Sequence, residues 1–385
     1  MFMLGWNDGS TGPLLPRIQE VYRCSYLQGF IIGALLNVWL TDRLGFGKVR
    51  AALQIITYSV QSAAPPFPAF IIFQVVNGIG LALQDAQANG FVGALTYSPA
   101  TKMGILHADW EPFAAPLVAT QFAQLDRWSF HYLTSLGLSV VNTIILSAIF
   151  RFRQQDTCLL EGGEHVQPVA EGKEEGKFKQ IMSEKTVHFL AFFILVYVGV
   201  EVTIGGWIVT YIIEERNGGP SSGYISSGFF GGLTLGRVVL LPVNKWIGER
   251  RALYIYALLS LGLEFVIWFV PSLVGNAITV SFIGMLLGPM YPIAMNQASR
   301  ILPSWLLTGS IGWIAGFGQA GSALIPFMTG AISEKHGIKS LHPLLVAMMA
   351  LMVILFALIP NKPLVDAEEP PAEVVNEKKD EKTTA

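Results

Sequence analysis

The chain has 385 residues, of which 52% are hydrophobic and only 14% are charged. A soluble protein usually carries about a quarter charged residues, so this apolar excess excludes an ordinary soluble enzyme and predicts many membrane-spanning segments. The net charge of −2 gives no sign of nucleic-acid binding. The two cysteines, Cys24 and Cys158, provide neither a disulfide framework nor metal-ligand spacing, and we expect no cofactor and no metal.

Twelve apolar segments follow one another along the chain. A helix needs about 20 apolar residues to cross the hydrocarbon core of a bilayer. The segments lie near residues 2–16, 24–41, 51–65, 68–95, 103–122, 130–150, 187–213, 221–244, 251–271, 274–299, 306–332 and 341–360. They predict an all-α integral membrane protein. The first two are expected to be shortened, because little sequence lies between Pro16 and Asp42 to complete one helix and build another.

The segment 151–185 is charged and lacks apolar periodicity. It predicts a cytoplasmic linker between two bundles of six helices, residues 1–150 and 186–360. The tail, residues 361–385, is rich in Pro, Glu and Lys and is expected to be disordered. If both termini are cytoplasmic, most Lys and Arg residues outside the helices lie on the cytoplasmic side, as membrane proteins prefer. The linker and the tail supply more than half of the Lys and Arg residues on the cytoplasmic side. The short loops alone therefore support the orientation less strongly.

A polar loop with Asp42, Arg43 and Lys48 separates the second and third spans. The glycines around it let two helix ends turn and approach closely. The pattern returns 203 residues later, where Gly232, Gly236 and Gly248 repeat Gly29, Gly33 and Gly45. Since both copies lie between apolar spans, they indicate a duplicated architecture.

The loop resembles the cytoplasmic loop motif between the second and third helices of the major facilitator superfamily, and residues 236–251 resemble its degenerate copy. The sequences of residues 5–13, 37–43 and 83–89 resemble those of the fungal, fucose-permease-like branch. The resemblance implies the twelve-helix major facilitator fold with two pseudo-symmetric halves. It also implies a secondary transporter for a small polar solute such as a monosaccharide, coupled to protons. We expect a monomer in the lipid bilayer of the plasma membrane.

Three carboxylates within apolar spans are candidates for proton coupling: Asp8, Asp85 and Glu201. A charge at the bilayer centre costs about 2.5–3.5 kcal/mol on insertion scales, so such residues are functional candidates by default. Asp8 and Asp85 are flanked by amides and are placed in the coupling role by the resemblance. The alternative is a structural hydrogen bond within the bundle. Glu201 has a second alternative, an ion pair with another span.

Amides and aromatic rings suit a sugar, because amides read hydroxyl groups and rings stack on the apolar face. The structural alternative is an interhelical hydrogen bond for each amide and packing for the tryptophan. The candidates for substrate binding are Asn7, Asn77, Gln84, Gln87, Asn89, His107, Tyr291, Asn296, Trp313 and Gln319. The stretch 106–113 departs from the resembling pattern, with Asp109, Glu111 and Pro112 inside an apolar span.

Gating is expected at the loop residues Asp42, Arg43 and Lys48 and at Arg237 in the second half. Charge pairs that form in one state only would bias inward-open against outward-open forms. Plain anchoring of the loops at the membrane surface is the alternative. A face of glycines on the eighth span and the break at residues 288–292 predict close helix contacts and a bent tenth helix.

Two functions therefore remain open: a proton-coupled transporter, or a non-transporting sensor or truncated remnant. The shortened first spans favour the second, and the retention of Asp8 and Asp85 favours the first. We expect no enzymatic activity, because no metal cluster, nucleophile elbow or phosphate loop is present.

Overall fold

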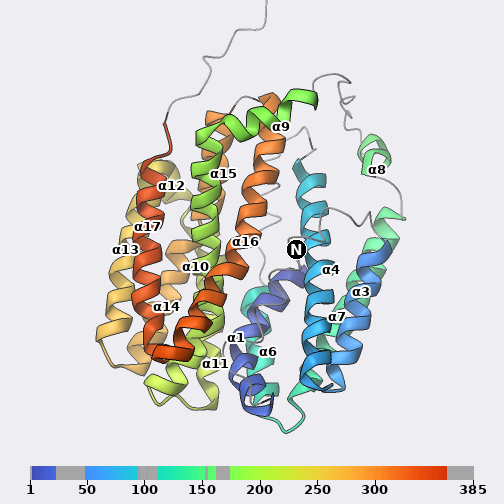
Figure 1. Cartoon of the computed structure of the whole chain (residues 1–385), viewed down its shortest axis with the longest axis vertical. Coiled ribbons are helices and arrows are strands. Elements are labelled where there is room, and N and C mark those ends of the chain that lie inside the picture. The colour runs from blue at the N-terminus through green and yellow to red at the C-terminus, as the bar shows by residue number, and fades with distance from the viewer. Residues whose placement is uncertain are drawn as a thin grey trace, which may run out of the picture.

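The computed structural model describes residues 2–22, 48–93, 95, 102, 111–151, 155–161, 174–302 and 304–361. Within these ranges every regular element is a helix (Figure 1). The first half comprises α1 (Phe2–Tyr22), α3 (Lys48–Ser62), α4 (Phe67–Gly93), α6 (Glu111–Ala123), η1 (Trp128–Phe130) and α7 (His131–Phe150). The second half comprises α10 (Lys185–Glu215), η2 (Pro220–Ser222), α11 (Gly223–Val239), α12 (Leu241–Ile247), α13 (Glu249–Phe269), α14 (Leu273–Leu287), α15 (Met290–Ile301), α16 (Ser304–His336), η3 (Ile338–Ser340) and α17 (Leu341–Ala357).

Among the described residues, six helical segments are long and apolar enough to cross a membrane. They are Trp128–Phe150, Lys185–Glu215, Glu249–Phe269, Leu273–Ile301, Gly309–His336 and Ile338–Ala357. The segments Pro220–Val239 and Leu241–Ile247 bend by 52° where they join and together make up to one more span. An all-α, multi-pass architecture is therefore confirmed. The predicted second span and the loop residues Asp42 and Arg43 lie outside the described residues.

The first helix is longer than the predicted segment 2–16, since α1 continues to Tyr22. Arg17 and Glu20, which follow the predicted segment, lie in the last turns of α1 and form an ion pair of 2.6 Å. The hydroxyl of Tyr22 donates to the backbone oxygen of Pro65 at 2.7 Å, which ties this end to the α3–α4 connection. The predicted span ended where the apolar residues end. The helix continues beyond them because an ion pair and a hydrogen bond stabilise its polar last turns.

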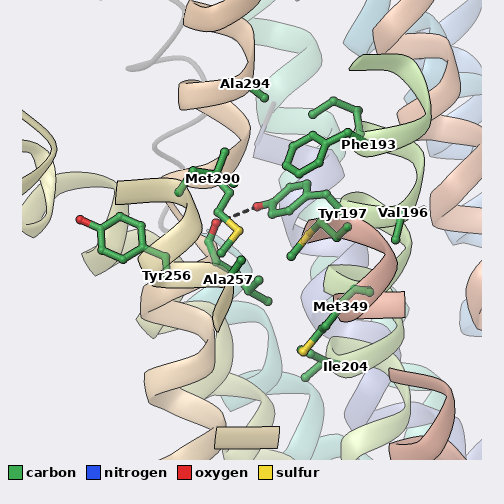
Figure 2. Packing of buried hydrophobic residues seen from close by; sticks show 14 of the residues in the cluster. Phe193, Val196, Tyr197, Ile204, Tyr256, Ala257, Met290, Ala294 and Met349 are labelled. Carbon is green, nitrogen blue, oxygen red and sulfur yellow. Dashed lines mark hydrogen bonds between the residues drawn. The ribbon is translucent and has the colours of Figure 1, made fainter. Parts of the chain in front are cut away.

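The second half packs around a continuous apolar cluster (Figure 2). Phe193 and Tyr197 on α10 lie in its interior with Met349 on α17, and all three are fully buried. The predicted glycine face on α11 brings this helix against α14. A side chain at Gly232 would clash with the backbone oxygen of Ser281, so the two backbones are in direct contact there.

The tenth span breaks where the sequence predicted, between α14 and α15 at Gly288 and Pro289. The break leaves carbonyl groups without helical partners. The hydroxyl of Tyr197 donates to the oxygen of Leu287 at 3.1 Å (Figure 2). Nε of Arg237 donates to the oxygen of Gly288 at 3.4 Å. Side chains of α10 and α11 therefore support the bend.

The linker contains two short helices, α8 (Gln155–Glu161) and α9 (Glu174–Ser183), although no periodicity predicted them. Helix α9 packs on α10 and α16 (Figure 1). Phe178 contacts the ring of Trp313 edge-on, with centroids 6.3 Å apart. Tertiary contact with the second half, rather than a strong local pattern, accounts for this helix. We call the end of the bundle that carries α9 the linker end.

The two halves meet at the end opposite the linker (Figure 1). The extensive contacts between them join α1 and α6 to α10, α11 and η2. A side chain at Gly12 would clash with the backbone oxygen of Gly205, so α1 and α10 touch through their backbones. The amide of Gln121 is hydrogen-bonded to the hydroxyl of Tyr224 across the same junction.

Candidate functional site

An amide bridge joins α1 to α4 inside the first half. Nδ2 of Asn77 donates to Oδ1 of Asn7 at 3.0 Å, and Asn77 is fully buried. Asp8 follows Asn7 and lies within electrostatic reach of the Tyr58 hydroxyl on α3. Residues of α1, α3 and α4 therefore come together near Asn7 and Asp8. Two residues predicted to bind substrate and one predicted to couple protons come together here.

Helix α4 continues from Asn77 toward the linker end and carries Asp85 eight residues later, a rise of about 12 Å. The backbone places Asp85 on the same helix as the amide bridge. The side chains of Gln84, Asp85, Gln87 and Asn89 lie outside what the structure describes. The same holds for the side chain of Lys48 at the start of α3, and His107 lies wholly outside the described residues.

In the second half, Glu201 on α10 and Arg237 on α11 come together. Nη2 of Arg237 lies 3.8 Å from Oε1 of Glu201, and both side chains are mostly buried. Tyr197 lies within electrostatic reach of both, and its ring lies 6.3 Å from that of Tyr291 on α15. This arrangement favours the ion-pair alternative for Glu201. The pair faces the bend of the tenth span.

Two predicted substrate residues lie in other surroundings, near the linker end. Trp313 stacks edge-on against Phe178 of the linker helix and contacts His188, so packing accounts for its position. Nδ2 of Asn296 donates to Oε1 of Glu249 at 3.1 Å, and Glu249 pairs with Arg300 at 2.7 Å. These contacts favour the structural alternative for both residues, and their role in substrate binding stays a prediction. Gln319 is half-buried on α16 and interacts within the protein.

Sequence reasoning missed a buried polar row on α7, which holds His131, Ser135 and Ser139. A second row on α3, the helix that packs against it, holds Gln54, Thr57 and Gln61. We call the two rows together the polar seam. Their spacing of three or four residues was a usable signal, because it places each row on one helix face.

A buried acid–base pair in the second half was also missed. Nδ1 of His342 on α17 lies 2.5 Å from Oε1 of Glu264 on α13, and each side chain is 1% exposed. The ring of Tyr211 lies edge-on to His342, with centroids 4.2 Å apart. The residues are 78 positions apart, so no local pattern could show that they meet.

A cavity of about 890 Å³ lies at the junction of the halves, at the end opposite the linker. Residues of α1, α6 and α10 line it, and Arg17, Glu20, Asp126 and Glu214 give it a mixed charge. Its lining does not include Asp8 or Asn77.

The family model of the Major Facilitator Superfamily matches residues 2–326. The chain belongs to this superfamily. This is a family of membrane transporters and not of enzymes, as the sequence predicted. The match spans both halves and the linker, so the fold class of two helical bundles is confirmed, although the described residues do not show all twelve helices.

Relatives and solved structures agree with this placement. The chain is 25% identical to Bypass of stop codon protein 6 of Saccharomyces cerevisiae, over 94% of this chain and 81% of that protein. It is 24% identical to a glucose/galactose transporter of Brucella abortus, over 88% of this chain and 86% of that protein. A D-xylose–proton symporter has the same fold with a TM-score of 0.72, 12% identity and coverage of 94% and 95%. The fucose:proton symporter of E. coli matches with a TM-score of 0.56, 16% identity and coverage of 93% and 96%.

Proposed function

We propose that this protein is a secondary active transporter that moves a small polar solute, such as a monosaccharide, together with protons. The observation that carries the proposal is the position of Asp8 on α1. One helical turn separates Asp8 from Gly12, where α1 touches α10 of the other half. A change of charge at Asp8 therefore acts on the helix that closes one end of the junction.

Alternating access follows from the way the halves meet. The described contacts between them concentrate at the end opposite the linker. We propose that the linker end is cytoplasmic, with both termini, and that the protein lies in the plasma membrane as a monomer. The structure then corresponds to a form closed toward the outside, and rocking of the halves would open it.

A monosaccharide is supported by the names of the relatives, which include a glucose/galactose transporter and sugar–proton symporters. We propose a position closest to the fucose-permease-like branch. In the first half, Asn7 and Asn77, with Gln84, Gln87 and Asn89 of α4, would read the solute's hydroxyl groups. Tyr291 and Gln319 would contribute from the second half.

Proton coupling is assigned to Asp8 and Asp85 in this proposal. Glu201 and Arg237 would act as a pair that opens and closes with the bend of the tenth span. Asp42, Arg43 and Lys48 would form the matching gating group of the first half.

The test is uptake into liposomes that contain a pH dye, with hexoses, deoxyhexoses and polyols added outside. We expect one solute to acidify the lumen, and we expect Asp85→Asn and Asp8→Asn to abolish this while solute exchange remains. Glu201→Gln breaks the proposed gating pair, so it should slow acidification and solute exchange alike, which separates gating from coupling. If correctly folded protein gives no acidification with any solute, a non-transporting sensor or a truncated remnant is favoured. If acidification persists in Asp85→Asn, Asp85 has no role in proton coupling.

A further inference from the structure

A basic pocket lies toward the linker end of the second half, where α12, α13 and α15 meet the residues that follow α17 (Figure 1). Its volume of about 400 Å³ falls in the range of small-ligand sites, about 300–1,000 Å³. Its charged lining consists of four basic side chains and one carboxylate, namely Lys245, Arg250, Arg251, Arg300 and Glu249. The excess of positive charge indicates an anionic ligand.

Two of the basic side chains hold the walls of the pocket together. Nη1 and Nη2 of Arg250 donate to the backbone oxygens of Pro360 and Ile359, at 3.1 Å and 2.6 Å. Nη2 of Arg300 on α15 lies 2.7 Å from Oε2 of Glu249 on α13. Carbonyl oxygens carry no net charge, so the charge of Arg250 is not neutralised by its partners.

The other two basic side chains are available to a ligand. Lys245 on α12 and Arg251 on α13 are exposed, and neither forms an ion pair within the part of the chain that the structure describes. Gly248, with φ of +85°, makes the turn between the two helices, so both side chains reach one pocket. A phosphate group suits such a pair, because it accepts several charge-assisted hydrogen bonds.

The pocket lies where a span of the second half begins. Helix α13 starts its span at Glu249, and α12 departs by 52° from the direction of α11. Trp246, which also lines the pocket, is 86% exposed. Exposed tryptophans are typical of the level of the lipid headgroups. The basic side chains of the pocket are therefore at the level of lipid phosphates.

An exposed apolar strip leads away from the pocket along α13. Ile255, Leu258 and Leu259 follow Arg251 by four, seven and eight residues, so the four share one helix face, and all three apolar side chains are exposed. Helix α13 packs on α14 and α17 and lies on the side of the second half that is remote from the first half (Figure 1). The strip therefore faces lipid.

The strip reaches Leu258 about 10 Å below Arg251. A molecule with an anionic head and an apolar tail fits both the pocket and the strip, whereas a soluble anion fits the pocket alone.

We propose that this pocket binds the headgroup of an anionic phospholipid. Lys245 and Arg251 contact its phosphate, and one acyl chain lies along the strip of α13. In the proposed orientation the linker end is cytoplasmic, and the cytoplasmic leaflet is the one that carries anionic lipids. The bound lipid joins α12, α13 and α15 and stabilises this end of the second half. The site is separate from the solute route between the halves and does not depend on the solute.

The first test is native mass spectrometry of the purified protein with phosphatidylserine or phosphatidylcholine of the same acyl chains. We expect phosphatidylserine to be retained in preference. Lys245→Gln/Arg251→Gln should weaken its affinity roughly 25-fold, about fivefold for each basic side chain, and leave phosphatidylcholine unaffected. Both side chains are exposed, so the variant should have the Tm of the wild type in lipid-free detergent.

A matched control separates the pocket from general surface charge. Lys179→Gln/Lys185→Gln also removes two exposed lysines near the linker end, but neither residue lines the pocket. This variant should bind phosphatidylserine like the wild type. An equal loss of affinity in the two double variants would overturn the proposal, and so would an unchanged affinity in Lys245→Gln/Arg251→Gln.

The second test uses the wild type and needs no variant to fold. Liposomes contain phosphatidylserine or phosphatidylcholine with a photoreactive diazirine on the acyl chain. We expect the ratio of labelling by the two lipids to be several-fold higher at Ile255 and Leu258 than at Ile144 and Ile149 of α7, which are also exposed and apolar. Equal ratios on the two helices would contradict a bound lipid on α13.

Two other anions are distinguished in the same spectrometric assay. Excess inorganic phosphate should leave phosphatidylserine bound, and on its own it should not raise the Tm as the lipid does. Displacement by phosphate would identify a soluble anion as the ligand. Deletion of the acidic residues 366–385 should leave the affinity for phosphatidylserine unchanged. Affinity that appears only after this deletion would show that the tail, and not a lipid, is the natural occupant.

Discussion

The two halves of the molecule bury different chemistry. In the second half, α10 is the centre of a continuous apolar cluster that reaches α11, α13, α14 and α17. In the described part of the first half, the apolar cluster is smaller, and buried residues of α1, α3 and α7 include Gln61, His131 and Ser135. Lipid is as apolar as a leucine side chain, so burial from lipid contributes little and packing or polar contacts must hold helices together. Apolar packing is more extensive in the second half, and buried polar residues are prominent in the described part of the first half.

This difference shows that a repeated sequence pattern does not give two halves with the same buried side chains. The glycine repeat predicts related halves, yet the proposed proton-binding residue and the polar seam lie together in the first half. The carboxylates Glu201 and Glu264, inside spans of the second half, are each paired, Glu201 with Arg237 and Glu264 with His342. We therefore treat the second half as the more rigid body.

The largest effect is expected where the second half is packed most closely. Gly232→Leu on α11 would force a side chain into the backbone of α14, so we expect no folded protein. Gly262→Leu on α13 meets open space and should behave like the wild type. Size-exclusion chromatography of the solubilised variants distinguishes the two. A normal monodisperse peak for Gly232→Leu would show that α11 and α14 are not in backbone contact.

The buried acid–base pair tests whether the second half depends on polar contacts as well. Glu264→Leu leaves His342 unpaired in the core and should lower the free energy of unfolding by about 3–5 kcal/mol. The double variant Glu264→Leu/His342→Leu should recover most of that loss, because both polar groups are removed. Thermal unfolding in detergent measures each. If the double variant is as unstable as the single one, the pair does not explain the loss.

The apolar clusters of the two halves can be compared by matched truncations. Phe193→Ala in the large cluster should cost roughly 2–3 kcal/mol, below the value for a soluble core because lipid also solvates an apolar side chain. Phe70→Ala in the smaller cluster should cost less, since its surroundings can close around the cavity more easily. Equal losses in chemical unfolding would remove this distinction between the halves.

The smallest effect is expected from one hydrogen bond of the first half. Trp6→Phe keeps the aromatic contact with His131 but loses the bond to Ser135, which should cost about 1 kcal/mol. Ser135→Ala should cost a similar amount, and the double variant little more than either alone. Additive losses in the same unfolding assay would contradict a direct bond.

Most of the fold could be predicted from local sequence. Apolar length predicted the helices, and the Gly288–Pro289 break followed from residues that cannot continue a helix. The predicted end of α1 lay too early in the sequence. The ion pair of Glu20 and the hydrogen bond of Tyr22 stabilise the last turns of this helix, which are not apolar. Helix α9 was missed for the same reason, since its packing on α16 comes from a distant part of the chain.

The sequence predicted which polar residues are candidates for the site, but not which of them are in contact. Asn7, Asp8 and Asn77 were selected as polar residues in apolar spans, and only the packing of α1 on α4 showed that the two amides form a bridge. Glu201 and Arg237 were given separate roles, and the structure pairs them. Trp313 and Asn296 have suitable side chains, and their contacts with Phe178 and Glu249 favour the structural alternative.

By itself the sequence determined that this protein is a helical membrane protein with duplicated halves, because apolar length, loop charge and glycine spacing are local properties of the chain. The tertiary structure alone decided which polar groups meet. It brought α3 and α7 together to form the polar seam and closed α1 on α10 at one end of the junction. The physical reason is that a hydrogen bond or ion pair depends on distances of a few ångströms between helices, and these are set by how whole helices pack.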